Sequence, residues 1–126
     1  MMNNNMNKQN NKQVKECPIP ELREALRKQA MTLDSQLSRS VARRTTCDDI
    51  PCVEYNDEVR NQYRLAEMLL YTQRCRYVLE LCMEKGGATY RCRWADGTVT
   101  VTRFKKVGIN RVKVTGLLMP EEKSAA

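Results

Sequence analysis

The glycine pair Gly86-Gly87 separates a part of the chain with helical periodicity from a part with strand periodicity. Before the pair, apolar residues recur every three or four positions, which is the spacing of one helix face. After the pair, apolar and polar residues alternate, as in a sheet that is buried on one side only. Separate runs of helices and strands are typical of an α+β fold. At 126 residues the chain has room for one such domain.

Two long helices are predicted ahead of the glycine pair. The first covers 21–44, with Pro20 at a first helical position, where its missing N–H costs nothing. The second covers 59–84, with Asn56 as its N-cap residue. The stretch between them contains Pro51, which does not continue a helix. We therefore expect the two helices to form a hairpin.

The dipeptide Asp96-Gly97 lies between two alternating runs and predicts a β-hairpin with a two-residue turn. That turn pairs Ala95 with Thr98. The register then sets Trp94 opposite Val99 and Cys92 opposite Val101 on the inner face, and Arg93 opposite Thr100 and Arg91 opposite Thr102 on the outer face. After a break at 105–110, the run 111–115 supplies a third strand. The predicted fold is α+β: two long helices packed on a C-terminal three-stranded antiparallel β-meander.

The expected core draws on both helices and all three strands. Its members are Leu22, Leu26, Leu33, Leu37, Leu65, Leu69, Leu79, Trp94, Val99, Val101, Val112 and Val114. Residues 1–16 are rich in Asn, Gln and Lys and are predicted to be a disordered tail, because they have too little apolar surface to offset the entropy of ordering. The domain then spans 17–118, and 119–126 form a flexible tail. We expect no membrane segment or signal peptide, and hence a cytoplasmic protein.

Catalytic, metal and cofactor signatures are weak. The chain has no histidine, no glycine-rich phosphate loop and no nucleophile elbow. Its six cysteines do not follow zinc-ligand spacing; Cys47 and Cys52 are separated by four residues and the others are scattered. We interpret Cys75, Cys82 and Cys92 as small core residues. The expectation is a protein that is not an enzyme and carries no cofactor or metal.

Positive charge is concentrated in the strand region. The net charge is +7, and residues 90–118 hold seven basic residues against one acidic residue. Arginine forks match phosphate geometry, so a cationic sheet face is a candidate nucleic-acid interface, for DNA or RNA. In the predicted register Thr98, Thr100 and Thr102 lie among the cations. The candidate binding residues are Arg91, Arg93, Lys105, Lys106, Arg111, Lys113, Phe104 and Arg74.

The stretch RLAEMLLYTQRCRYVLELCMEKGG, followed by the hairpin, resembles a winged helix-turn-helix DNA-binding domain. In that resemblance 65–70 end the first helix of the motif, 72–84 form the recognition helix, and Asp96-Gly97 is the wing tip. It implies a transcriptional regulator with Arg74 and Tyr77 facing the major groove. The sequence departs from the motif at Leu70, where a turn glycine is usual, and at Arg76, where an apolar residue is usual. Whether residues 57–85 form one helix or a helix-turn-helix therefore stays open.

The sequence is compatible with two functions. The first is a small nucleic-acid-binding accessory or regulatory protein that uses the cationic sheet face. The second is a protein-protein interaction module or homodimeric adaptor that uses the apolar stripe of its helices, since Met31, Leu70 and Met83 add to an apolar surface wider than a short sheet covers.

Overall fold

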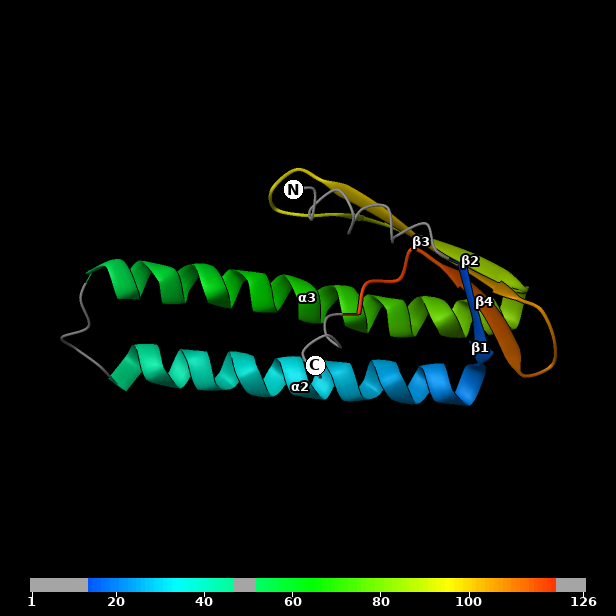
Figure 1. Cartoon of the computed structure of the whole chain (residues 1–126), viewed down its shortest axis with the longest axis horizontal. Coiled ribbons are helices and arrows are strands. Elements are labelled where there is room, and N and C mark those ends of the chain that lie inside the picture. Colours follow the sequence, from blue (N-terminus) through cyan, green and yellow to red (C-terminus); the bar gives the residue numbers. More distant parts are fainter. Residues whose placement is uncertain (1–13, 47–51, 120–126) are drawn as a thin grey trace.

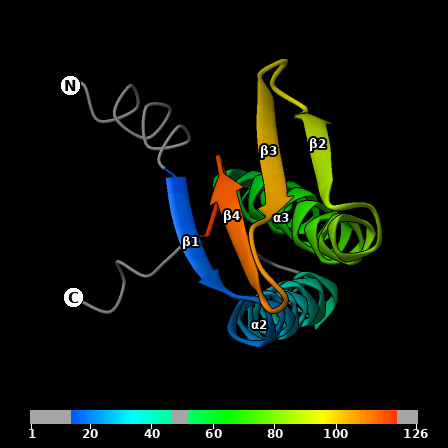
Figure 2. The ribbon, with the colours of Figure 1, turned by 90° about the vertical axis from the view of Figure 1, so that its right-hand side faces the viewer.

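The computed structural model describes residues 14–46 and 52–119. The elements follow in the order β1 (Val14–Pro18), α2 (Ile19–Thr46), α3 (Cys52–Lys85), β2 (Gly87–Arg93), β3 (Val99–Lys106) and β4 (Arg111–Thr115). The two helices lie side by side and antiparallel, and the strands cover one end of this helical hairpin (Figure 1). Seen along the helices, the sheet crosses in front of that end (Figure 2). The predicted α+β class is confirmed, with a different strand count.

Both helices are longer than predicted. α2 begins at Ile19 and ends at Thr46, and α3 already begins at Cys52. Asn56 therefore lies inside α3 instead of capping it, and that prediction was wrong. Proline disfavours helix at the residues that precede it and not at those that follow, so Pro51 does not prevent a helix that starts at the next residue.

α3 is one continuous helix of 34 residues, about 51 Å long. It passes without a break through Leu70, where the helix-turn-helix motif requires a turn. The Thr72 hydroxyl donates to the Met68 carbonyl, one turn earlier, at 2.8 Å. The winged helix-turn-helix interpretation is therefore wrong, because residues 57–85 lie in a single helix. At the C-terminal end, the Gly86 amide donates to the Cys82 carbonyl at 2.7 Å, and Gly86 adopts a φ of 92° that favours glycine.

The sheet has four strands in the order β1-β4-β3-β2, all antiparallel, where three were predicted. The additional strand is β1, which pairs with β4 and starts at Val14, within the stretch predicted as a tail. Its end is fixed where the Ile19 amide donates to the Asn110 carbonyl at 2.8 Å. The chain thus leaves the sheet at one edge, runs through both helices and returns at the other edge. The rest of the two predicted tails, 1–13 and 120–126, lies outside the part that the structure describes.

The register of the β2–β3 hairpin is shifted by one residue from the predicted one. Arg93 lies opposite Val99, and Arg91 lies opposite Val101. The loop has three residues, because the Trp94 amide donates to the Thr98 carbonyl and the Gly97 amide donates to the Trp94 carbonyl. Gly97 has a φ of 93°, as in a type I turn followed by a glycine bulge. This loop exchanges the two faces of β3 and leaves those of β2 as predicted.

The core lies between the sheet and the ends of the helices that it covers. Of the predicted core, Leu22, Leu26, Leu33, Leu79, Val112 and Val114 are buried, whereas Leu37, Leu65, Leu69, Trp94 and Val101 are half-buried. Val99 is 37% exposed, because the shifted register turns it outward. The residues that the prediction missed include Tyr71, Phe104 and Ile19, all nearly inaccessible. Cys75 and Cys82 are buried as predicted, and Cys92 packs against the core.

Candidate nucleic-acid interface

The outer face of the sheet, turned away from the helices, is strongly basic. Alternate residues of each strand point to this face. The inner positions are identified by buried residues such as Phe104 and Val112, so the positions between them face outward. Six basic side chains lie on the outer face, and we call them the cationic face: Arg91, Arg93, Arg103, Lys105, Arg111 and Lys113.

Five of the eight predicted site residues belong to this face: Arg91, Arg93, Lys105, Arg111 and Lys113, all exposed. The other three do not. Phe104 is only 2% exposed and packs in the core, so its assignment to the polar face was wrong. Lys106 pairs with Val112, an inward residue, and is half-buried. Arg74 lies on α3, near the hydroxyl of Tyr90, and therefore not on the outer face of the sheet.

Arg103 is the residue that the sequence prediction missed. It lies opposite Thr89 and Thr115 at the centre of the outer face. In the predicted register it pointed inward. The sequence signal was Phe104 itself: a phenylalanine next to two basic residues is better buried than exposed, which turns Arg103 outward. The same shift turns Thr100 and Thr102 inward, so the predicted row of threonines among the cations is absent from this face.

Like charges lie close together on the cationic face. Lys105 is directly opposite Lys113, a pairing that places the two Cβ atoms about 5 Å apart. The acidic neighbour is Glu16 of β1, which also lies opposite Lys113 and accepts a hydrogen bond from Nε of Arg111 at 3.0 Å. Among residues 14–46 and 52–119, this is the ion pair that the structure shows on the outer face. Both partners are about half exposed, so the pair contributes little to stability.

Aromatic packing holds the hairpin that carries Arg91 and Arg93. The ring of Tyr71 on α3 stacks on Tyr90 at a centroid distance of 5.7 Å and contacts Trp94 at 5.3 Å. The Trp94 indole also donates to the hydroxyl of Thr100 on the facing strand at 3.0 Å. The inner side of the hairpin is thereby packed on α3, and its outer side, with Arg91 and Arg93, faces solvent.

A chain of buried hydroxyls fixes the end of β4. The Leu118 amide donates to the Tyr71 hydroxyl at 3.0 Å, and the Thr102 hydroxyl donates to the Gly116 carbonyl at 3.0 Å. Because the proton of Thr102 is used in this way, Tyr71 is the donor in the 2.7 Å contact between the two hydroxyls. Burial raises the pKa of Tyr71, so the phenol keeps its proton.

The buried thiols are poor candidates for chemistry. Burial raises the pKa of Cys75 to about 12, which keeps the thiol protonated and a weak nucleophile. The part of the chain that the structure describes contains no group of three or more Cys, Asp or Glu residues arranged to hold a metal ion. Cys47 lies outside that part.

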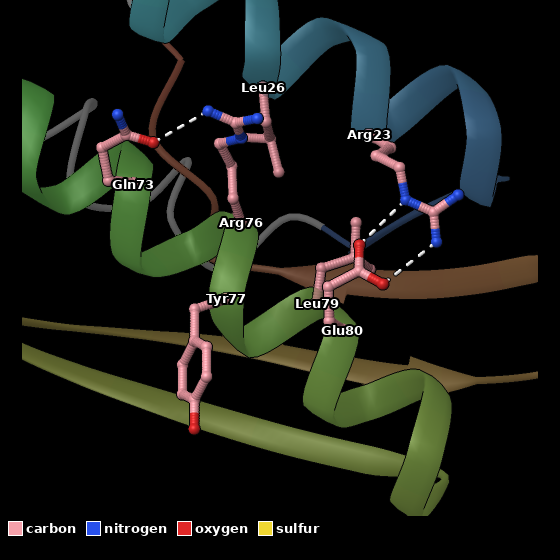
Figure 3. A pocket seen from close by; sticks show the side chains of 7 residues that line it. All are labelled: Arg23, Leu26, Gln73, Arg76, Tyr77, Leu79 and Glu80. Carbon is pink, nitrogen blue, oxygen red and sulfur yellow. Dashed lines mark hydrogen bonds and ion pairs between the residues drawn. The ribbon is translucent and has the colours of Figure 1, made fainter.

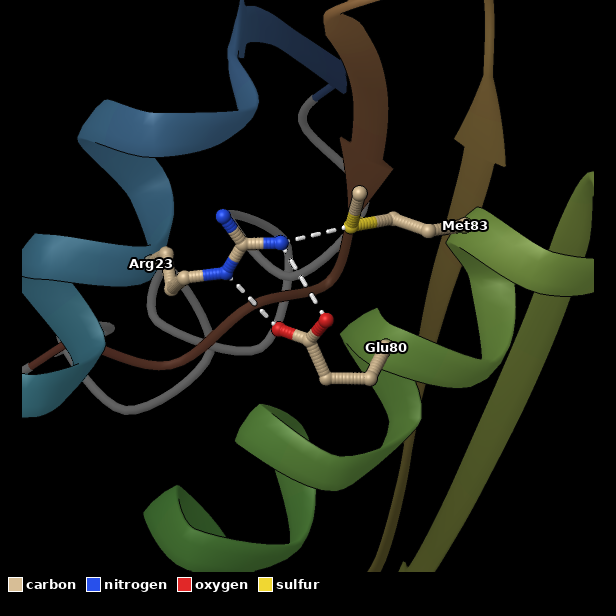
Figure 4. Close-up of polar contacts among 3 residues, drawn as sticks. All are labelled: Arg23, Glu80 and Met83. Atoms are coloured by element: carbon tan, nitrogen blue, oxygen red, sulfur yellow. Dashed lines mark hydrogen bonds and ion pairs between the residues drawn. The ribbon is translucent and has the colours of Figure 1, made fainter.

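A shallow pocket of about 300 Å³ lies between α2 and α3, but its charges are engaged with each other (Figure 3). The Arg23 guanidinium donates to both carboxylate oxygens of Glu80, at 2.8 and 3.1 Å, and to the sulfur of Met83 (Figure 4). The hydrogen bond to Glu80 raises the pKa of Arg23. Arg76, also in the pocket, donates to the Gln73 side chain at 2.9 Å. The pocket is therefore a weaker ligand site than the cationic face.

No protein-family model, curated protein or solved structure matches this chain. The helices within the described ranges also include none with both the length and the apolar character needed to cross a membrane.

Proposed function

We propose that this protein binds nucleic acid, DNA or RNA, through the phosphate contacts of its cationic face, as a non-catalytic accessory or regulatory protein of the cytoplasm. The observation that supports the proposal is that, among the residues the structure describes, six basic side chains gather on one solvent-facing surface of a sheet beside the carboxylate of Glu16. Such a density of like charge is unfavourable for the isolated protein and favourable next to a polyanion.

The chemistry of the face suits a phosphate backbone. Arg91, Arg93 and Arg103 provide planar donors that match phosphate oxygens two at a time. Along one strand, outward residues such as Arg103 and Lys105 are about 6.6 Å apart, and neighbouring strands are about 4.8 Å apart. A face built in this way makes several phosphate contacts at once and reads no base sequence.

The salt dependence of binding tests the proposal. If about five of the six cations contact phosphates, log affinity falls with log salt at a slope of about −4.5 for duplex and about −3.5 for single strands. Fluorescence anisotropy with labelled duplex DNA, single strands and hairpin RNA over a range of salt concentrations measures this slope. The absence of binding at low salt, or binding without salt dependence, would contradict the proposal.

A matched pair of variants tests the location. The double variant Arg91→Ala/Arg93→Ala removes two cations from the cationic face and is expected to reduce the slope by about two. Lys28→Ala/Arg64→Ala removes the same charge from exposed positions on α2 and α3 and is the control. Equal loss of affinity in both variants would mean that net charge, and not the cationic face, determines binding.

A further inference from the structure

One side of α3 carries an exposed apolar stripe that the sheet and α2 leave uncovered. Tyr63 is 71% exposed, Leu70 is 50% exposed and Tyr77 is 66% exposed. The three residues are spaced seven apart and therefore share one helix face, with a drift of about 20° from each to the next. The half-buried Val59 and Leu81 continue the stripe at its two ends. The stripe is about 33 Å long.

The stripe faces solvent, and at Tyr77 it borders the shallow pocket between α2 and α3. In Figure 3 the ring of Tyr77 points away from α2, while Arg76 points towards it. The residues of α3 that pack on the sheet, Tyr71, Cys75 and Cys82, lie on another side of the helix. Within the described ranges, no helix or strand lies along the outer side of α3 in the view along the helices, where only the short connection to β2 curves round its end (Figure 2). A partner helix thus has access along the whole stripe.

The apolar residues of the stripe are spaced symmetrically on either side of Leu70, so the stripe can pack against a second copy of itself. A two-fold axis at Leu70 sets two antiparallel copies of α3 against each other, so that each position faces the position equally far on the other side of residue 70. Tyr63 then meets Tyr77 of the other copy, and Val59 meets Leu81. A stripe with a seven-residue repeat suits a left-handed crossing of about 20°, the packing of coiled coils.

Charge complementarity supports the same arrangement. Glu67 and Arg74 lie on the same flank of the stripe, three residues before and four residues after Leu70. The two-fold axis therefore brings Glu67 of each copy to within one residue, about 1.5 Å along the helix, of the level of Arg74 of the other. Within one copy the two residues are seven apart, about 10 Å along the helix, and too distant to pair. One Glu67 oxygen accepts a hydrogen bond from the Ala95 amide of the β2–β3 loop, so the carboxylate lies on the sheet side of the stripe. Two ion pairs then flank the central Leu70 contact.

We infer that the stripe of α3 is the interface of a symmetric homodimer in which α3 packs antiparallel against α3 of a second copy. The interface is isologous: the same residues are used on both sides, and the contact closes after two copies. This inference is independent of the proposed nucleic-acid binding, because the stripe and the cationic face have no residue in common.

The first experiment is sedimentation equilibrium of the full chain and of Leu70→Glu. The wild type is expected to dimerise. Leu70→Glu sets two like charges together on the symmetry axis and is expected to raise the dimer dissociation constant by at least about tenfold. Met31→Glu, at an apolar position of α2 that is 59% exposed, is the control and should dimerise as the wild type does. Circular dichroism verifies that each variant is folded.

The second experiment is a charge exchange. Glu67→Arg and Arg74→Glu are each expected to weaken the dimer, and the double variant to restore it. A purely structural effect inside one copy would not be reversed in this way, because the two side chains do not meet there. A wild type that stays monomeric at its highest soluble concentration, a Leu70→Glu variant that dimerises as tightly as the wild type, or a double variant no tighter than the singles would overturn the inference.

Discussion

Replacement of Phe104 with alanine tests which way β3 faces. The side chain is 2% exposed and belongs to the cluster that joins the sheet to both helices. Removing a buried phenylalanine loses about 1.5–3 kcal/mol of transfer free energy and leaves a cavity, so Phe104→Ala is expected to cost about 3–5 kcal/mol. Val101→Ala is the control, because this outward valine is only half-buried and its loss should cost about 1 kcal/mol or less.

The free energies come from urea unfolding followed by the fluorescence of Trp94, the single tryptophan, which packs beside Tyr71. A domain of this size has a total stability of about 5–15 kcal/mol, so the loss expected for Phe104→Ala is a large fraction of it. With the two-residue turn predicted from the sequence, Phe104 would be exposed and Val101 buried, and Val101→Ala would then cost more stability than Phe104→Ala. A smaller loss for Phe104→Ala than for Val101→Ala would therefore refute the one-residue shift.

Other substitutions test the buried network and the surface pair. Tyr71→Phe removes the acceptor of the Leu118 amide and is expected to cost about 1–3 kcal/mol, with faster hydrogen exchange at that amide; unchanged exchange would show that the bond is not formed. The raised pKa of Cys75 means that the folded state keeps a proton that the unfolded thiol loses above its ordinary pKa of 9.0. Unfolding free energy should then fall by about 1.4 kcal/mol per pH unit above about pH 9, and Cys75→Ala should remove this contribution in urea titrations. Glu80→Ala breaks the exposed pair with Arg23 and should change the unfolding free energy by less than about 1 kcal/mol; a larger loss would mean that the pair is not solvent-screened.

The helices could be predicted from the sequence because long amphipathic patterns report directly on which face is buried. The pattern of Leu22, Leu26 and Leu33 is of this kind, and all three are buried. β1 could not be predicted in the same way. Its sequence, VKECP, has a single large apolar residue, and it forms a strand because β4 offers a free edge beside the start of α2. A strand that forms because a neighbouring strand is available to pair with it need not show a strand pattern in its own sequence.

The candidate site was partly predictable for a related reason. Asp96-Gly97 indicates a hairpin, but the dipeptide fits both a two-residue turn and a three-residue turn with a bulge. The two loops differ by one residue, which reverses the faces of β3. β2 precedes the turn and β4 is set by its own valines, so Arg91, Arg93, Arg111 and Lys113 were predicted on the correct face. Arg103 and Phe104, which follow the turn, were predicted on the opposite faces.

The sheet covers only one end of the helical hairpin, and this divides the molecule into a clamped end and an overhanging end. The buried residues of α3 run from Tyr71 to Cys82, whereas residues 59–70 are half-buried or exposed. At the overhanging end the two helices pack on each other without the sheet. The backbone hydrogen bonds there therefore open at a lower free energy of local unfolding than those beneath the sheet. We therefore expect α3 to be more rigid in the half on which the strands pack than in the half that extends beyond the sheet.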